Sequence, residues 1–475
     1  MYVLKTAHDY SPELWKRLCI IHDRLESFLD RRGYDVAATP VLESTELFLR
    51  KSGGELASQM YSFTDPSGRQ VSLRPELTAS IVRQFIDGNL SGPIPQRWQY
   101  YGTIFRYESS SKGESAGDAR EFQQLGAEII GASSEFADAE VLATAVQGLT
   151  TLGVTGHRLR VGHMGVVNAM LEALGLSERA RVFVVNSFHD LRLGEPGVQI
   201  VRQRATDLGL LGEERTQALS QLARRMAPED AEGMVAGFLA QGVTGLSGQR
   251  TPEEIFRRYL RKLKEAGAPE LMDAALRFSA ELVALSGPAT EVRTKLGELL
   301  KRFELRDDVL SPVDKLLKAL GQYDLKHTPV ILDLGMARGI AYYTGVVFDI
   351  DHGKVKDCPS LGGGGRYDGL VKALGAKLDV PALGFAYAVN RIAEILPSDY
   401  GSDQASGAVR VLVTAQETQR SQAVTTAERL RAQGIPAELD LSDRNDSEVA
   451  KYAEQRGIQT VMRVGSDGAI SEKAT

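Results

Sequence analysis

The chain has little cysteine, since Cys19 and Cys358 are the only two among its 475 residues. Two cysteines exclude a disulfide framework and a cysteine-based zinc site. The sequence also contains neither a CxxC nor an HExxH motif. No protein motif therefore predicts a metal centre.

Long apolar runs are lacking as well, because no stretch of about 18 apolar residues occurs. The N-terminal segment "MYVLKTAHDYSPELWKRL" has no apolar core of the length that a signal peptide needs. We therefore expect no membrane partner and a cytoplasmic location. The net charge of −6 neither supports nor excludes a nucleic-acid partner, because local patches decide such binding.

What the sequence does contain is typical of a soluble globular protein, with 43% apolar and 25% charged residues. Its length allows two or three domains. In the first 150 residues, segment 13–32 has helical apolar spacing and "MYSFTDPSGRQVSLR" predicts a hairpin around Pro-Ser-Gly. The stretches "RWQYYGTIFRYE" and "REFQQLGAEIIG" predict two strands, followed by a helix over 134–150. Helices between antiparallel pairings indicate an α+β fold, and we assign residues 1–174 to the first part of a core domain.

Helical patterns dominate residues 175–325, which we interpret as a helical insertion. Strand patterns return with "PVILDL" and "AYYTGVVFDID", and a final helix is expected from about Gly384 to Leu396. Residues 326–398 therefore complete the core.

A polar linker, "SDYGSDQASGA", separates the core from a C-terminal module at residues 408–475. Strand and helix patterns alternate in this module and end at glycines. The alternation predicts a small βαβαβ unit with a parallel sheet.

The strand "REFQQLGAEIIG" carries the first candidate site. Successive strand residues face opposite sides, so Phe122, Gln124, Gly126 and Glu128 share one face. An aromatic plate, an amide, a bare glycine and a carboxylate are typical of a pocket floor, although a solvated sheet face is the plainer interpretation. Arg106 ends the preceding strand, and a cation beside such a floor favours an anionic ligand group.

Three other stretches favour a plain structural role when each is taken alone. "LRPELT" places Glu76 and Thr78 at a strand-to-helix corner, where a carboxylate commonly stabilises the helix dipole. The stretch "LGGGGRYDG", residues 361–369, predicts a glycine-rich turn rather than a phosphate loop. "FRRYLRKLK", residues 256–264, predicts a solvated basic helix face more than an RNA contact.

"ARGIAYYTGVVFDI" predicts a strand in which Tyr342 and Tyr343 face opposite sides. An aromatic-rich strand is common. The flanking Gly339 and Gly345, however, indicate close approach of another group. We interpret this stretch as one wall of a pocket.

In their order along residues 33–392, these segments resemble the histidyl-tRNA synthetase family of class II aminoacyl-tRNA synthetases. The similar stretches are "GYDVAATPVLE", "LRPELTASIVR", "FRYE" with "REFQQLGAEIIG", "ARGIAYYTGVVFD", "LGGGGRYDGL" and "PALGFAYAVNRI". The resemblance implies a six-stranded antiparallel catalytic sheet, an anticodon-binding-like C-terminal domain and a homodimer. It implies ATP-dependent activation of histidine, with Mg²⁺ accompanying ATP, and transfer to tRNA(His).

Carried over residue by residue, the resemblance implies two groups of site residues. The histidine group comprises Glu76, Thr78 and Gln124 for the ammonium, Glu128 and Tyr343 for the imidazole, and Tyr342 beside them. The ATP group comprises the catalytic Arg106 and Arg338 at the carboxylate and α-phosphate, with Phe122 and Arg391 around the adenine and Glu108 nearby.

The same family includes a regulatory branch that does not charge tRNA, namely the histidine-sensing subunit of the short-form ATP phosphoribosyltransferase. "LRVGHMGVVNAMLEALGL" resembles this branch, and Ala341 stands where synthetases usually have Asp. Ala388 and Asn390 stand where Gly and an acidic residue are usual. If the chain were such a regulator, its partner would be the phosphoribosyltransferase catalytic subunit. A third hypothesis is a synthetase-like RNA-binding protein without activation.

Overall fold

The computed structural model describes residues 9–50, 53–88, 92–107, 120–211, 269–325, 327–336, 342–353, 360–401, 411–442, 444–465 and 470–474. The chain divides into two compact units, Met1–Leu396 and Pro397–Thr475. None of the helices in the described ranges is both long enough and apolar enough to cross a membrane.

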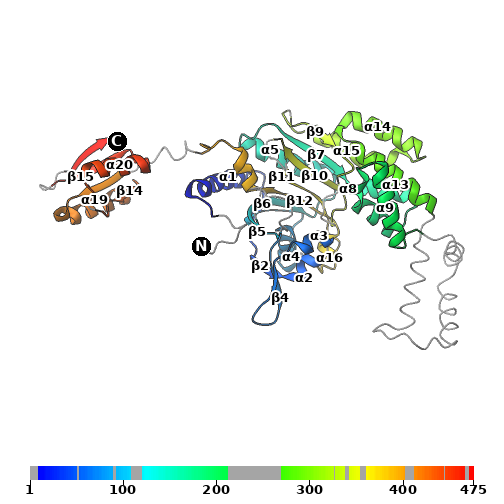
Figure 1. Cartoon of the computed structure of the whole chain (residues 1–475), viewed down its shortest axis with the longest axis horizontal. Helices are drawn as coiled ribbons and strands as arrows, with labels where there is room; N and C mark the ends of the chain where they lie inside the picture. Colours follow the sequence, from blue (N-terminus) through cyan, green and yellow to red (C-terminus); the bar gives the residue numbers. More distant parts are fainter. Residues whose placement is uncertain are drawn as a thin grey trace. The chain divides into compact units, whose positions relative to one another are not determined.

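A mixed sheet of nine strands forms the centre of the first unit (Figure 1). In spatial order its strands are β1 (Asp35–Val36), β5 (Gln96–Phe105), β6 (Glu121–Ile130), β12 (Ala382–Ala388), β11 (Ser360–Arg366), β10 (Val346–His352), β7 (His157–His163), β9 (Val330–Leu332) and β8 (Gly287–Pro288). From β5 to β7 each strand pairs antiparallel with the next. The six-stranded antiparallel sheet implied by the resemblance is therefore confirmed, with β1 and β9 added in parallel at its sides.

Strand β11 corrects the prediction of a turn at residues 361–369. Gly362 to Gly365 pair with β10 on one side and with β12 on the other. A Cβ at Gly362 would lie 2.6 Å from the Ala386 carbonyl oxygen, so the neighbouring backbone occupies the space that a side chain needs. Glycine weakens an isolated strand, but two flanking strands and a close backbone approach overrule that preference here.

Two other predicted boundaries are also wrong. The helix expected from about Gly384 starts only at Val389, as α17, because the residues before it belong to strand β12. Tyr342 and Tyr343 precede the strand they were assigned to, because β10 begins at Val346. Both segments are rich in small or aromatic residues, and pairing across the sheet rather than local pattern decides where each strand begins.

Helices cover both faces of this sheet. The helices are α1 (Pro12–Asp30), α5 (Glu135–Thr151) and α17 (Val389–Ile395), with α2 (Thr45–Leu49), α3 (Gly53–Ser58), α4 (Thr78–Gly88) and α16 (Leu370–Ala373). α1 packs against α5 and α17, and α5 packs against β10, β11 and β12. α4 and α16 pack together through a core that includes Ile81, Phe85, Trp98 and Val371. The helices predicted over 13–32 and 134–150 are thus present, and Ser11 and Ser134 cap their N-termini through their side-chain oxygens.

The predicted hairpin is confirmed as part of a small three-stranded sheet. Its strands are β2 (Leu42–Ser44), β4 (Gln70–Leu73) and β3 (Ser62–Thr64), with β4 in the middle. The Asp65 carboxylate accepts the backbone N–H groups of Ser67 and Arg69, which closes the turn.

A helical layer lies beside the β7–β9 side of the sheet (Figure 1). Its members are α6 (Met164–Ala173), α7 (Glu178–Asn186), α8 (Phe188–Leu191), α9 (Glu195–Asp207), α13 (Pro269–Ala284), α14 (Ala289–Arg302), the 3₁₀ helix η2 (Asp307–Leu310) and α15 (Ser311–Leu320). They share one apolar core that also reaches Leu332 of β9. The basic stretch at residues 256–264 lies outside the described residues.

The second unit is an α/β module. Its elements are β13 (Val411–Ala415), the 3₁₀ helix η3 (Glu417–Gln419), α19 (Arg420–Ala432), β14 (Ala437–Leu439), α20 (Asp446–Arg456), β15 (Thr460–Val464) and β16 (Ile470–Ala474). β13 pairs in parallel with both β14 and β15, as the alternating pattern predicts. The pattern does not predict β16, which adds an antiparallel edge to β15.

Candidate active site

A cavity of about 360 Å³ opens above the middle of the antiparallel sheet. It is lined by Leu56, Gln59, Glu76, Thr78, Arg106, Phe122, Gln124, Glu128, Tyr342, Tyr343, Ser360, Gly362, Gly363, Gly364, Tyr367, Gly384, Phe385, Ala386, Ala388 and Arg391. Nine of the eleven candidate site residues named from the sequence are therefore brought together. The other two, Glu108 and Arg338, lie outside the described residues, as does Gly339.

Small residues make the floor of this cavity. Gly363 on β11 pairs with Ala386 on β12, and both line the cavity. Because residues directly opposite in neighbouring strands share a face, this pair of small residues leaves space above the sheet. Phe122, Gln124 and Glu128 line the cavity from β6, as their alternation predicts.

Glu128 is the most deeply buried acidic group of the cavity, at 1% exposure. Its carboxylate accepts three hydroxyl groups: Thr78 at 2.9 Å, Tyr100 at 2.8 Å and Tyr367 at 2.5 Å. Burial raises the pKa of Glu128 to about 7, and the three hydroxyl donors oppose that rise. Glu128 is thus a carboxyl group held in one orientation that titrates near neutrality.

Tyr100 and Tyr367 are functional candidates that the sequence reasoning missed. Tyr100 lies across from Gly126, and its hydroxyl occupies the place where a Gly126 side chain would begin. The bare glycine therefore makes room for Tyr100 rather than for a ligand. The alternation in "RWQYYGTIF" places Tyr100 on the same face as Trp98 and could have drawn attention to it.

Glu76 supplies a second buried carboxylate at the corner between β4 and α4, with 4% exposure. Its Oε1 accepts the backbone N–H of Ala79 at 3.0 Å, which is the helix-start role expected for this residue. Its Oε2 is buried and has no hydrogen-bond partner among the described residues. Burial raises the pKa of Glu76, while Arg106 and the helix-start N–H groups lower it. The unpartnered oxygen in a cavity wall is a place for a ligand cation or N–H donor.

Guanidinium groups line another part of the cavity. Arg106 donates through Nε to the Pro75 carbonyl oxygen at 2.8 Å, and its guanidinium carbon lies 5.7 Å from the centre of the Phe122 ring. Arg391 donates to the Ser360 carbonyl oxygen at 3.1 Å. Both side chains are only partly buried. Two oriented cations and an aromatic ring in one cavity suit a ligand with anionic groups and a flat ring system.

The two adjacent tyrosines both line the cavity. Because they precede β10 rather than belong to it, the strict alternation expected for a strand does not apply. The Tyr342 ring lies 5.1 Å from Tyr343 and 5.7 Å from Tyr367, so the three rings form one cluster. The close approach indicated by Gly345 is made by Arg366, whose Cδ would lie 2.8 Å from an added Cβ.

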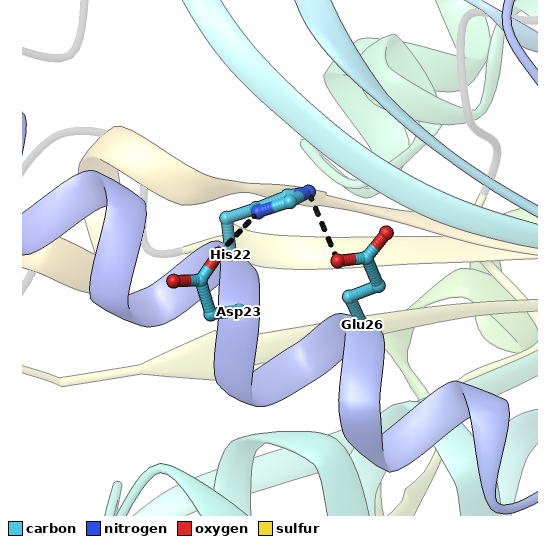
Figure 2. A group of neighbouring side chains, drawn as sticks. All are labelled: His22, Asp23 and Glu26. Atoms are coloured by element: carbon cyan, nitrogen blue, oxygen red, sulfur yellow. Dashed lines mark hydrogen bonds and ion pairs between the residues drawn. The ribbon is translucent and has the colours of Figure 1, made fainter.

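A separate group of possible metal ligands lies on α1, and none of its residues lines the cavity (Figure 2). His22 Nδ1 lies 2.9 Å from Asp23 Oδ1, whereas His22 Nε2 lies 4.0 Å from Glu26 Oε2. The two ring nitrogens thus face different carboxylates, as Figure 2 shows. One ligand atom from each of the three residues lies within 4.8 Å of the others, but exposed acidic groups commonly gather without an ion, and the His22 ring also packs on Tyr101 at 4.4 Å. We assign no function to this group.

Comparison with known proteins supports one family. A sequence model described as "Histidyl-tRNA synthetase" matches residues 6–231 and 243–392. A histidine–tRNA ligase of Methanococcus vannielii is 30% identical over 99% of this chain and 93% of its own length. A histidine–tRNA ligase of Pyrococcus horikoshii is 28% identical over 97% of this chain and 90% of its own length.

Two solved structures show the same fold at 22% sequence identity. One is described as an ATP phosphoribosyltransferase regulatory subunit/histidyl-tRNA synthetase from Bacillus halodurans, with a TM-score of 0.66 over 98% of both chains. The other is the histidyl-tRNA synthetase of S. aureus, with a TM-score of 0.59 over 100% of this chain and 97% of that one. The family model matches most of the chain, and a relative is 30% identical over 99% of it, so the chain belongs to the histidyl-tRNA synthetase family.

Proposed function

We propose that this chain is a histidine–tRNA ligase, which activates histidine with ATP to histidyl-adenylate and transfers the histidyl group to tRNA(His). The charge layout of the cavity carries this proposal. The cavity offers the buried carboxylates of Glu76 and Glu128 and the partly buried guanidinium groups of Arg106 and Arg391. A ligand that carries an ammonium and a ring N–H as well as a carboxylate and phosphates matches these charges.

On the histidine side, the unpartnered Glu76 oxygen would accept the ammonium group, with Thr78 and Gln124 as further partners. Glu128 would accept a hydrogen bond from the imidazole, and the Tyr342 and Tyr343 rings would close the pocket around it. Because Glu128 is already oriented by three hydroxyl groups, little reorganisation is needed when the imidazole binds.

On the ATP side, Phe122 and Arg391 would enclose the adenine, and Arg106 would face the reacting phosphate. Glu108 and Arg338 join this group in the proposal by resemblance alone. Mg²⁺ would arrive with the ATP phosphates and help neutralise them. The histidine carboxylate attacks the α-phosphorus and pyrophosphate leaves, so fixed guanidinium groups stabilise the charge that develops. Positioning rather than covalent enzyme chemistry provides much of the rate.

The decisive experiment is histidine-dependent exchange of pyrophosphate into ATP, followed by charging of tRNA(His). Exchange that requires histidine supports the proposal. Histidine binding without any exchange would contradict it. The proposal includes a homodimer, for which light scattering on the purified chain gives the mass.

A histidine-sensing regulatory subunit is the second candidate function. It is favoured by Ala388 and Asn390, which depart from the residues usual in synthetases. The Asn390 side chain accepts the backbone N–H of Gln123 at 2.8 Å and donates to the Tyr10 hydroxyl at 3.2 Å, so it is engaged within the fold. Histidine binding without exchange, together with stimulation of a short-form ATP phosphoribosyltransferase catalytic subunit, would support this alternative.

Replacing Tyr100 with Phe should move the pH dependence of histidine binding upward. Loss of one hydroxyl donor raises the pKa of Glu128 above about 7, because the donor stabilises the charged form. Histidine binding that requires the ionised Glu128 carboxylate is lost as pH falls through this pKa. The loss should therefore occur about 0.5–1 pH unit higher in the variant than in the wild type. Calorimetric titration with histidine across pH 5.5–8.5 measures the shift.

Tyr101→Phe is the matched control for this prediction, because Tyr101 neighbours Tyr100 on β5 and packs on His22 instead of Glu128. The titration of free histidine is the same for every protein variant, so any difference between profiles belongs to the protein. Equal shifts for Tyr100→Phe and Tyr101→Phe would refute the assigned role of Tyr100.

Arg338→Ala should abolish pyrophosphate exchange and leave the fold intact. The resemblance to the family implies that this arginine stabilises the α-phosphate, so its loss should act on the transition state more than on binding. Circular dichroism and the melting temperature monitor the fold. A variant with wild-type exchange would show that the assignment is wrong.

A further inference from the structure

Arg366 is a buried cation outside the cavity, at the end of β11, with 6% exposure. Its Nε donates to Asp138 Oδ1 at 2.9 Å, and Nη2 lies 2.8 Å from the same oxygen. Nη1 donates to the Ala132 carbonyl oxygen at 2.8 Å and to Asp368 Oδ1 at 3.0 Å. A buried guanidinium with this many fixed partners ties its strand to α5 and to the turn that follows it.

The backbone of Arg366 is tied to the segment that carries the adjacent tyrosines. Its carbonyl oxygen accepts the N–H of Thr344 at 2.8 Å. The Thr344 hydroxyl in turn accepts the backbone N–H of Asp368 at 3.1 Å. Gly345 packs on the aliphatic part of the Arg366 side chain so closely that a Cβ would lie 2.8 Å from Cδ. Thr344 and Gly345 therefore rest on Arg366.

Two tyrosines of the cavity, Tyr343 and Tyr367, lie near Arg366. Arg366 and Tyr367 are consecutive, so one side chain faces α5 while the other faces the cavity. Tyr367 donates to Glu128, and the Tyr343 ring lies against β11, where a Cβ at Gly365 would be 2.9 Å from Tyr343 Cδ1. A rotation of Arg366 would thus reach both rings on the histidine side, whereas Phe122 and Arg391 come from β6 and α17.

We propose that the Asp138–Arg366 ion pair is a positioning device for the histidine side of the cavity, acting through Tyr343 and Tyr367 from the opposite face of the sheet. This proposal rests on the proposed function, because it assumes that histidine binds at this end. Asp138 lies in the first turn of α5, so the ion pair fixes the tyrosines to a long helix that packs behind the sheet. Neither Asp138 nor Arg366 lines the cavity.

The test measures the dissociation constants of histidine and of ATP separately by calorimetry on the full chain. Asp138→Asn removes the charge that holds Arg366, and Asp138→Glu retains it. We expect the histidine dissociation constant to rise about tenfold in Asp138→Asn and less in Asp138→Glu, with ATP affinity changed less than about twofold. Thr344→Val removes the hydroxyl that accepts the Asp368 N–H. Because Thr344 is exposed, the fold should survive, and about a threefold loss of histidine affinity is expected.

Asp351→Asn is the matched control, because Asp351 is a buried carboxylate of the same sheet and pairs with Arg158 at 2.8 Å. It lies at the end of β10 remote from Tyr343, so it should lower the melting temperature without changing histidine affinity. Unchanged histidine affinity in Asp138→Asn and Thr344→Val, or equal losses for histidine and ATP, would overturn the positioning role alone. A wild-type chain that binds ATP but no histidine would overturn the proposed function, and the positioning role with it.

Discussion

Glu128→Gln is expected to reduce histidine affinity by about 10²- to 10³-fold while leaving ATP binding nearly intact. The carboxylate that would accept the imidazole N–H becomes an amide, whose N–H₂ group must face hydroxyl groups or the ligand N–H. The cavity then presents an N–H donor at a position where the wild-type carboxylate accepts hydrogen bonds. Calorimetric titration with histidine and with ATP, and histidine-dependent pyrophosphate exchange, measure the two effects separately.

Glu121→Gln provides the control for this variant. Glu121 begins the same strand, is exposed and does not line the cavity. It should bind histidine as the wild type does. If Glu128→Gln retained wild-type affinity and exchange, Glu128 would have no part in recognising the ligand.

The stability of Glu128→Gln should also depend on pH in a defined direction. Burial raises the pKa of Glu128 from 4.5 to about 7 in the folded chain. Between these values the folded state binds more protons than the unfolded state, so this group makes the wild type less stable as pH rises. Glutamine does not titrate. The melting temperature of the variant relative to the wild type should therefore increase from pH 4.5 to pH 7, and a constant difference would contradict the raised pKa.

Gly384→Ala should impair both folding and histidine binding, which distinguishes it from the change at Glu128. The added Cβ would collide with the Glu128 carboxylate and lie 2.5 Å from the Ala127 carbonyl oxygen. Backbone cannot move aside inside a sheet paired on both sides, so we expect a loss of about 3 kcal/mol in the free energy of unfolding. Displacing the carboxylate should weaken histidine binding by about 10²-fold or more.

Gly88→Ala is the control for this prediction, because a Cβ at Gly88 meets no atom of the described ranges within 4 Å. Alanine at this helical position should leave stability unchanged or slightly higher. Denaturant unfolding gives the free energies, and histidine titration gives the affinities. Equal stability of Gly384→Ala and Gly88→Ala would contradict this prediction, because it would mean that β12 accommodates the added Cβ despite the close contacts.

Local pattern was sufficient wherever neighbouring residues along the chain determine the conformation. The hairpin of β3 and β4, the helices α1 and α5 and the alternation along β6 follow from turn chemistry, capping serines and strand geometry. The shared face of Phe122, Gln124 and Glu128 is of this kind. For the same reason the corner bearing Glu76 and Thr78 was placed correctly.

Local pattern failed where the partner of a residue comes from a distant strand. Four consecutive glycines in β11 have no strand preference of their own, and only β10 and β12 on either side make them a strand. The same holds for β12, of which the part from Gly384 onward was assigned to a helix. Tyr100 was missed because its role depends on Gly126 and Glu128 across the sheet.

By itself, the sequence determined the family and the residue types of the cavity, because ordered motifs over most of the chain record which side chains are present. The tertiary structure decided what those side chains do to one another. It placed three hydroxyl groups on Glu128, left one Glu76 oxygen without a partner in the part of the chain that the structure describes, and set Arg366 behind the tyrosines. Burial and hydrogen bonding depend on atoms from strands and helices far apart in the chain, so these properties exist only after the sheet has formed.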